Sequence, residues 1–142
     1  MSSNKINAKN APKPVGLYPH ARKVGNLLFL SGVGPRKAGS GPNDSHVPGL
    51  ELDHNGNFKS FDFASQCHSV FQNVKTILEE SGSSWENLVD ITVFLVDMKR
   101  DFQTFNKIYA DYFSTNQPCR TTVAINSLPT PIAIELKCIA TI

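Results

Sequence analysis

Apolar residues recur along this chain with two different spacings, and these predict where its helices and strands lie. Between residues 62 and 82, and between 100 and 113, the spacing is three to four positions, which is typical of a helix with one buried face. The apolar positions of the first helix are Phe63, Cys67, Val70, Val74, Ile77 and Leu78, and those of the second are Phe102, Phe105, Tyr109, and Tyr112 or Phe113. Short apolar or alternating runs predict strands near residues 20–24, 27–30, 49–52, 88–97, 119–126 and 132–140.

The order of these elements, β-β-(β)-α-β-α-β-β, predicts an α+β fold: one mixed six-stranded sheet with both helices packed on one face. Gly25 and Asn26 are typical of a hairpin turn, and the last two strands flank a Pro-containing turn like a second hairpin. Residues 34–56 are rich in Gly and Pro, and an irregular stretch of that length is often functional. Because the other face of the sheet is left uncovered, the pattern predicts a homo-oligomer packed sheet to sheet.

Length and composition indicate one domain. At 142 residues we place it at residues 15–142, after a disordered or extended segment at residues 1–14. No apolar run is long enough to cross a bilayer, and the polar N-terminus lacks the apolar part of a secretory signal. Three cysteines without a CxxC spacing argue against a disulfide framework and a zinc site, so we expect no metal and a reducing, cytoplasmic location. Cys119 and Cys138 are expected to be buried, unreactive thiols.

Positive charge is concentrated near the N-terminus, although the net charge is only +2. Half of the 14 Lys and Arg residues lie in the first 37 positions, before the first acidic residue, Asp44. Two interpretations stay open: a solvated basic tail and strand face, or a positive rim that attracts a small anionic ligand. A nucleic-acid partner is disfavoured, because no basic stripe is interleaved with aromatic residues.

Two opposite charges interrupt the strand-like C-terminal segment. Arg120 begins one predicted strand and Glu135 lies inside the next. One explanation is an edge strand whose Glu135 and Lys137 are solvated. The other is functional: Arg120 offers a planar fork to a carboxylate, and Glu135 acts as a general base or orients a water. Thr122 lies two residues after Arg120, so its hydroxyl points to the same side.

These residues belong to a wider resemblance. The chain resembles the RidA (YjgF / L-PSP) family in GLYPHA (16–21), LLFLSGVGP (27–35), NLVDITVFLVDM (87–98), FNKIYADYF (105–113), CRTTVAINSLP (119–129) and IAIELKCIA (132–140). Its most diagnostic features are Pro-x-Arg before a strand, a Leu-Pro turn and a Glu fifteen residues after the Arg. The PHARKVG stretch and the long loop after Ser31-Gly32 are more similar to the 2-aminomuconate deaminase branch.

The resemblance implies a homotrimer with a chorismate-mutase-like fold, whose clefts at the subunit interfaces bind a small anionic substrate. Family members hydrolyse enamine or imine acids to keto acids and ammonia without a cofactor. By similarity, Arg120 binds the substrate carboxylate, Glu135 positions water and Tyr18 lies at the cleft mouth. Other pocket positions that match the family are Ser31, Gly32, Asn106 and Thr122.

The substrate stays open between 2-aminomuconate and 2-iminobutanoate or 2-iminopropanoate types. A second substrate carboxylate would need a cation or donor, for which His20, Arg36 and Lys37 are candidates. Pro19 and His20 replace the family's usual Ser and Gln, Val33 replaces another Gln, and Thr122 stands where many members have Cys. Alternatives are a non-catalytic trimer that binds a keto acid and, less favoured, a translation-inhibiting endoribonuclease.

Overall fold

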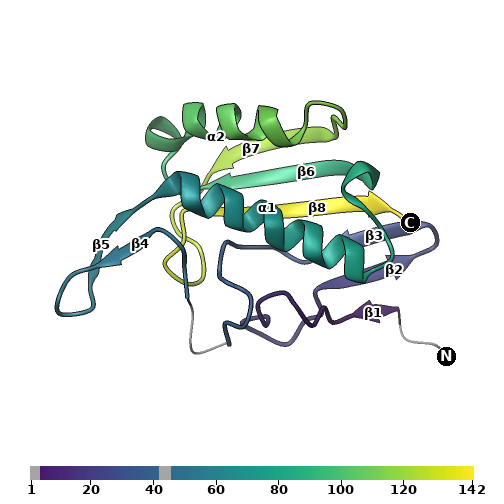
Figure 1. Ribbon diagram of the computed structural model, residues 1–142, viewed down its shortest axis with the longest axis horizontal. Helices are drawn as coiled ribbons and strands as arrows, with labels where there is room; N and C mark the ends of the chain where they lie inside the picture. Colours follow the sequence, from purple (N-terminus) through teal and green to yellow (C-terminus); the bar gives the residue numbers. More distant parts are fainter. Residues whose placement is uncertain (1–3, 42–45) are drawn as a thin grey trace.

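The computed structural model describes residues 4–41 and 46–142 and has the predicted α+β architecture (Figure 1). Its elements are β1 (Lys5–Ile6), β2 (Ala21–Val24), β3 (Leu27–Leu30), β4 (Leu50–Leu52), β5 (Phe58–Phe61), α1 (Phe63–Glu80), the 3-10 helix η1 (Trp85–Asn87), β6 (Leu88–Leu95), α2 (Met98–Tyr112), β7 (Cys119–Ala124) and β8 (Ile134–Thr141). Both predicted helices and every predicted strand are present. β1 and β5 were not predicted.

The main sheet has six strands in the order β1-β2-β3-β8-β6-β7. It is mixed, because β6 and β7 run parallel while the other neighbours are antiparallel. The predicted hairpin of the last two strands is wrong, since β6 lies between them. The edge-strand explanation for Glu135 is also wrong, because β8 pairs with β3 on one side and β6 on the other.

Capping side chains determine where the helices begin. The side chain of Asp62 accepts a hydrogen bond from Ser65 N–H at the start of α1, and Asp97 accepts one from Arg100 N–H at the start of α2. Because Asp97 is the cap, α2 begins at Met98, two residues before the predicted start. Gly82, with φ of +83°, follows the end of α1 in a conformation that favours glycine.

The two faces of the sheet differ in burial. On β8, Ile134, Leu136, Cys138 and Ala140 are buried, whereas the alternate residues Glu135, Lys137, Ile139 and Thr141 are only partly buried. The strand register places Phe29, Phe94 and Val123 on the same face of the sheet as that second set. Val24, Phe29 and Val123 are 56%, 36% and 37% exposed. We call this half-exposed apolar surface the open face.

The N-terminal segment is not disordered from residue 4 onward. β1 pairs with β2, and the buried residues Ala8 and Ala11 join the core. The Glu80 carboxylate accepts hydrogen bonds from Lys9 N–H and Asn10 N–H, which ties the segment to the end of α1. The domain therefore begins before the predicted boundary at residue 15. Residues 1–14 were expected to be disordered or extended, and the extended conformation is the correct one for β1. Residues 1–3 lie outside the described residues.

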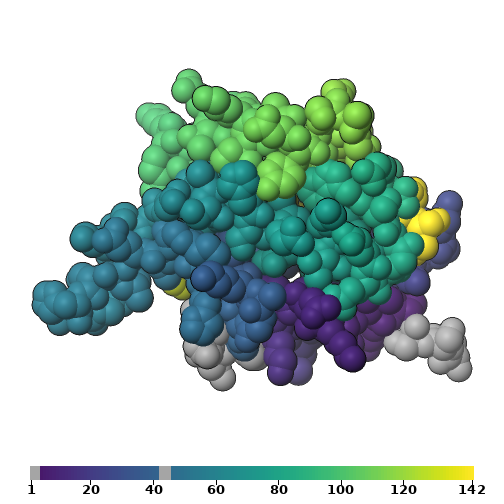
Figure 2. Space-filling view, in the orientation of Figure 1, coloured from purple at the N-terminus to yellow at the C-terminus, as the bar shows by residue number. Residues whose placement is uncertain are grey.

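The long Gly- and Pro-rich stretch is partly regular. β4 and β5 form a separate two-stranded antiparallel ribbon, which projects from the body of the molecule (Figure 2). The predicted strand at 49–52 therefore does not belong to the main sheet, and β1 is its sixth strand instead.

No helix within residues 4–41 and 46–142 is long and apolar enough to cross a membrane.

Candidate functional site

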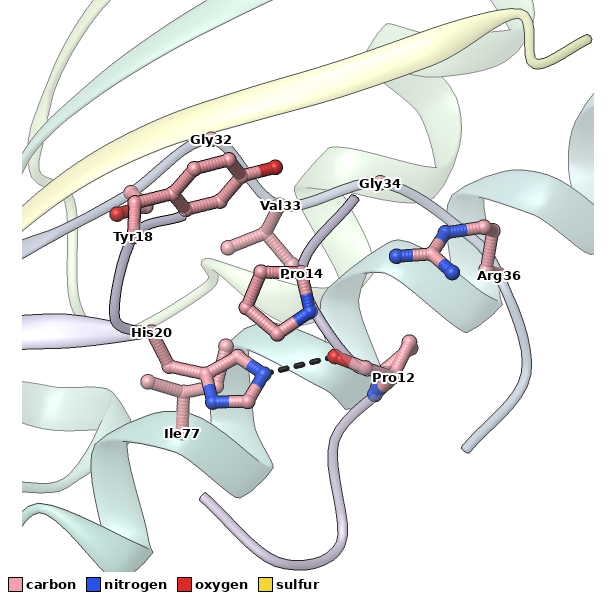
Figure 3. Close-up of a pocket in the computed structure, with 10 residues that line it drawn as sticks. Pro12, Pro14, Tyr18, His20, Gly32, Val33, Gly34, Arg36 and Ile77 are labelled. Atoms are coloured by element: carbon pink, nitrogen blue, oxygen red, sulfur yellow. Dashed lines mark hydrogen bonds between the residues drawn. The ribbon is translucent and has the colours of Figure 1, made fainter. Parts of the chain in front are cut away.

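Most of the N-terminal candidate residues meet in one place. Tyr18, His20, Ser31, Gly32 and Arg36 line a small cavity of about 40 Å³, together with Pro12, Pro14, Val33, Gly34 and Ile77 (Figure 3). An adjoining cavity of about 50 Å³ is lined by Tyr18, Gly32, Gly34 and Arg36 as well, and also by Glu135. We call the two together the Glu135 hollow. The structure thus brings residues 18, 32, 36 and 135 together from distant parts of the sequence.

Glu135 projects from the open face of β8 into this hollow. Burial raises the pKa of its carboxyl above the usual range. Within the described residues, no group donates a hydrogen bond to this carboxylate and no cation pairs with it. An ionisable group that is desolvated and unpaired in a cavity is a candidate for proton transfer.

Gly32 provides the space that the carboxylate occupies. A Cβ atom built on Gly32 would lie 2.7 Å from Oε2 of Glu135, so any side chain there must displace the carboxyl group. The neighbouring hydroxyl of Ser31 donates to the carbonyl of Pro19 at 2.7 Å, which holds the loop of Tyr18 against β3.

We expect Gly32→Ala to reduce activity about tenfold or more, because a displacement of a reacting group by about 1 Å can cost 10²-fold. The added methyl group meets the end of a flexible side chain, so the fold should be retained. The measurement is the rate of the reaction proposed below, together with the melting temperature. Gly41→Ala is the control, since a Cβ there meets no atom of the described residues within 4 Å. Equal rates for wild type and Gly32→Ala would contradict this role of Gly32.

Arg36 is the cation of the hollow. It is only 9% exposed, and its guanidinium donates to the backbone carbonyls of Gly41 and Lys13. No carboxylate in the described part of the chain pairs with it. Burial lowers the pKa of Arg36, and the nearby Tyr18 opposes that effect.

Two side chains of α1 that the sequence analysis overlooked hold the segment that carries Arg36. Asn73 Nδ2 donates to the carbonyls of Gly34 and Arg36 at 2.9 and 2.7 Å, and Ser69 Oγ donates to the carbonyl of Pro35 at 2.7 Å. A sequence signal existed, because Asn73 lies seven positions after the buried Gln66 and shares its apolar helix face.

His20 and Lys37 are poorly placed to bind a substrate group. Nδ1 of His20 accepts the backbone N–H of Ala8, and Nε2 donates to the carbonyl of Pro12, so both ring nitrogens are used internally. This pattern requires the neutral tautomer with the proton on Nε2. Lys37 is exposed and is absent from the lining of the hollow. The expectation that His20 binds a second carboxylate is therefore corrected: its role is to hold the N-terminal segment.

A second cluster surrounds Arg120. Its Nη2 donates to Oδ1 of Asn106 at 2.8 Å, and its guanidinium lies over the rings of Phe105 and Tyr109. Thr122 is on the same face of β7, as predicted, and its buried Oγ1 has no partner among the described residues. Arg120 lines a separate cavity of about 390 Å³ between α2 and β7.

The two clusters lie on opposite faces of the sheet. Arg120 is level with Ile91 on the helix-covered face, whereas Glu135 is level with Phe94 on the open face. Ile91 and Phe94 are three residues apart on one strand, so their side chains point in opposite directions. One protomer therefore does not bring the Arg120 guanidinium and the Glu135 carboxylate into a common site.

The cysteines separate into two groups. Cys67 and Cys138 are buried, and burial raises the pKa of Cys138 to about 12. Cys119 is exposed, so the expectation of a buried thiol is confirmed for Cys138 and wrong for Cys119. Across the described ranges, 4–41 and 46–142, no group of three or more His, Cys, Asp or Glu side chains could hold a metal ion.

Comparisons with known proteins agree with this architecture. Residues 8–142 match the family model described as Endoribonuclease L-PSP. A RutC family protein of Pyrococcus abyssi is 36% identical over 140 residues, covering 99% of this chain and 98% of that protein. The chloroplastic Reactive Intermediate Deaminase A of Arabidopsis thaliana is 36% identical over 137 residues, covering 96% of this chain and 65% of that protein.

Solved structures give the same result. The YjgF gene product of E. coli is 31% identical with a TM-score of 0.79, and the match covers 98% of each chain. E. coli TdcF with bound serine is 27% identical with a TM-score of 0.78, covering 96% of this chain and 97% of that one. The chain therefore belongs to the RidA/YjgF/L-PSP family, which includes reactive intermediate deaminases.

Proposed function

We propose that the protein is a cofactor-independent deaminase that hydrolyses a small imine or enamine carboxylic acid to a keto acid and ammonia. The observation that carries this proposal is the Glu135 carboxyl group: it is desolvated, unpaired among the described residues and has a raised pKa, and it faces a cavity beside Tyr18 and Arg36. The family relationship to Reactive Intermediate Deaminase A supports the same reaction class.

The proposed chemistry needs only one group that accepts and returns a proton. An enamine acid tautomerises to an imine, and protonation of its nitrogen gives an iminium ion whose carbon is electrophilic. The Glu135 carboxylate takes a proton from water as the water oxygen bonds to that carbon, which gives a neutral carbinolamine. The carboxyl group then returns the proton to nitrogen, the C–N bond breaks, and the hydroxyl group passes its proton to the departing ammonia, so that the keto acid and ammonium are released. A raised carboxyl pKa suits both steps, because proton transfer is most effective when the pKa lies near the working pH.

We place the complete site between protomers of a homotrimer. Arg120 would bind the substrate carboxylate through its planar N–H fork, and Glu135 of the adjacent copy would deliver water. Two observations support this arrangement: Arg120 and Glu135 face opposite sides of the sheet, and the open face keeps apolar side chains exposed. A half-exposed apolar sheet face is typical of an interaction surface.

Arg36, which has no carboxylate partner among the described residues, supports a substrate with two acidic groups. A buried guanidinium without a carboxylate partner is unfavourable unless something compensates its charge. A substrate with a second acidic group, such as 2-aminomuconate, would do so, whereas 2-iminobutanoate would not. E. coli TdcF has been solved with bound serine, which supports a small amino-acid-like ligand for this fold.

Because Cys67 and Cys138 are buried free thiols, we assign the protein to a reducing compartment, the cytoplasm.

The proposal is tested by following ammonia release from enzymatically generated 2-iminobutanoate and 2-aminomuconate. Release above the spontaneous rate that Arg120→Ala abolishes supports the deaminase. Tight binding of a keto acid without any release would instead favour the binding protein. Cleavage of RNA under the same conditions, unaffected by Arg120→Ala, would favour the ribonuclease that the name of the family model suggests.

We expect Arg36→Ala to lower kcat/KM for 2-aminomuconate at least tenfold more than for 2-iminobutanoate, because a lost charged hydrogen bond costs about 1.5–3 kcal/mol. Lys37→Ala is the matched control, since Lys37 is the next basic residue but is exposed. Equal losses on the two substrates would mean that Arg36 only holds the backbone at Lys13 and Gly41.

A further inference from the structure

Arg120 is held by three contacts with neighbouring turns of α2. Its Cζ atom lies 5.3 Å from the ring centroid of Phe105 and 4.7 Å from that of Tyr109, and its Nη2 donates to Asn106 Oδ1 at 2.8 Å. Within residues 4–41 and 46–142 no carboxylate pairs with this guanidinium. The side chain is thus oriented by ring faces and one amide rather than by an acidic residue.

This kind of support leaves the guanidinium free for a ligand. An aromatic ring attracts a cation through its face, so it contacts the plane of the guanidinium and not its N–H edges. Asn106 uses one of the five N–H groups. A carboxylate from Asp or Glu would instead occupy the same bidentate edge that a substrate acid needs.

The ring of Tyr109 is itself fixed by its neighbours. It stacks on Phe113 with 4.2 Å between centroids and 28° between planes, and it contacts Phe105 at 5.4 Å. Its hydroxyl is buried and has no hydrogen-bond partner in the described part of the chain. The hydroxyl therefore does not anchor the ring, and the contact that matters to Arg120 is the ring face.

We infer that Tyr109 is a positioning residue. Together with Phe105, it holds Arg120 in the orientation required to bind a carboxylate. The inference rests on the proposed function, in which Arg120 binds the substrate acid. Tyr109 itself does not touch the substrate. Its removal should weaken binding of the acid and leave the chemical step nearly unchanged, because the ground state and the transition state both keep the carboxylate.

The test uses Tyr109→Phe, Tyr109→Leu and the matched control Tyr112→Leu in the full chain. Tyr112 is on the same helix and in the same aromatic cluster, and its hydroxyl bonds to His68, but its ring does not contact Arg120. Two quantities are measured: kcat and KM for ammonia release from 2-iminobutanoate, and the dissociation constant of 2-oxobutanoate by calorimetry.

Tyr109→Leu should raise KM and the dissociation constant about two- to fivefold with kcat within about twofold, as expected for loss of one cation–π contact. Tyr109→Phe keeps the ring face and should match wild type, and Tyr112→Leu should lower the melting temperature without changing KM. If Tyr109→Leu does not fold, Tyr109→Met carries the same expectation.

An unchanged dissociation constant in Tyr109→Leu, or an equal rise in Tyr112→Leu, would overturn the inference. Binding of 2-oxobutanoate without ammonia release would refute the deaminase but still measure the positioning effect. If wild type neither binds the keto acid nor releases ammonia, Arg120 has no carboxylate to bind and the positioning role fails with it.

Discussion

Glu135→Gln should reduce ammonia release about 10²- to 10⁴-fold, the usual contribution of a general acid–base group. The amide has nearly the same shape as the carboxyl group, so the hollow around Tyr18 and Gly32 should keep its form. It cannot, however, accept a proton from water at neutral pH. The measurement is kcat with 2-iminobutanoate, and KM should change little because Arg120 still binds the carboxylate.

The same substitution should stabilise the protein at neutral pH. Burial raises the pKa of Glu135 in the folded state above its usual value of 4.5. In the window between those two pKa values the folded state binds more protons than the unfolded state, so wild-type stability falls as the pH rises through it. Glu135→Gln lacks this titration, so its melting temperature should exceed that of wild type above the window and approach it below pH 4.5.

Two outcomes would contradict this account of Glu135. A variant with wild-type kcat would show that another group activates water. A variant that loses activity but is less stable than wild type at pH 7 would mean that the carboxylate makes a favourable interaction in the assembled protein, and that desolvation is not its main feature. Glu79→Gln is a control for loss of a charge, because Glu79 is exposed at the end of α1 and lines a different cavity.

Mixing two inactive variants should restore activity if each site takes Arg120 from one protomer and Glu135 from the next. Arg120→Ala keeps every Glu135, and Glu135→Ala keeps every Arg120. A trimer that contains both variants, in either ratio, has three interfaces, and one of them combines an intact Arg120 with an intact Glu135. About a third of the sites in such trimers are then complete, so about a third of the wild-type rate should return.

The experiment requires exchange of subunits, which is achieved by co-expression with two different affinity tags and purification on both. Mass measurement of the purified assemblies reports the number of subunits directly. Mixed trimers without activity would place Arg120 and Glu135 of the same protomer in one site, contrary to the opposite faces that they occupy here. An assembly that is not trimeric would remove the proposed interface.

Local patterns in the sequence predicted the helices well. The buried face of α1 contains all six apolar residues that its spacing indicated, because a helix that packs on a sheet must bury one stripe of its surface. The hairpin of β2 and β3 was equally clear, since Gly25 adopts a positive φ of 60° that glycine tolerates best. The starts of α1 and α2 differ from the predicted ones by one or two residues because Asp62 and Asp97 act as N-caps.

The pairing of the last two strands was not predictable in this way. A Pro-containing turn between two apolar runs suggests a hairpin, but β6 inserts between β7 and β8 and pairs with both. Strand order depends on contacts between residues far apart in the chain, which a local pattern does not contain. The ordering of residues 4–14 was missed for the same reason, because its hydrogen bonds come from Glu80 and His20.

The sequence by itself determined the two helices, the strands other than β1 and β5, the family and the residue types available for chemistry, because these depend on local spacing and on short motifs. Only the tertiary structure decided which of these residues meet. It grouped Tyr18, Gly32, Arg36 and Glu135 around one hollow, used both nitrogens of His20 for backbone contacts, and placed Arg120 on the opposite face of the sheet. The physical reason is that strand order and register set the direction of every side chain. The groups that surround a charged side chain then determine its pKa and its partners.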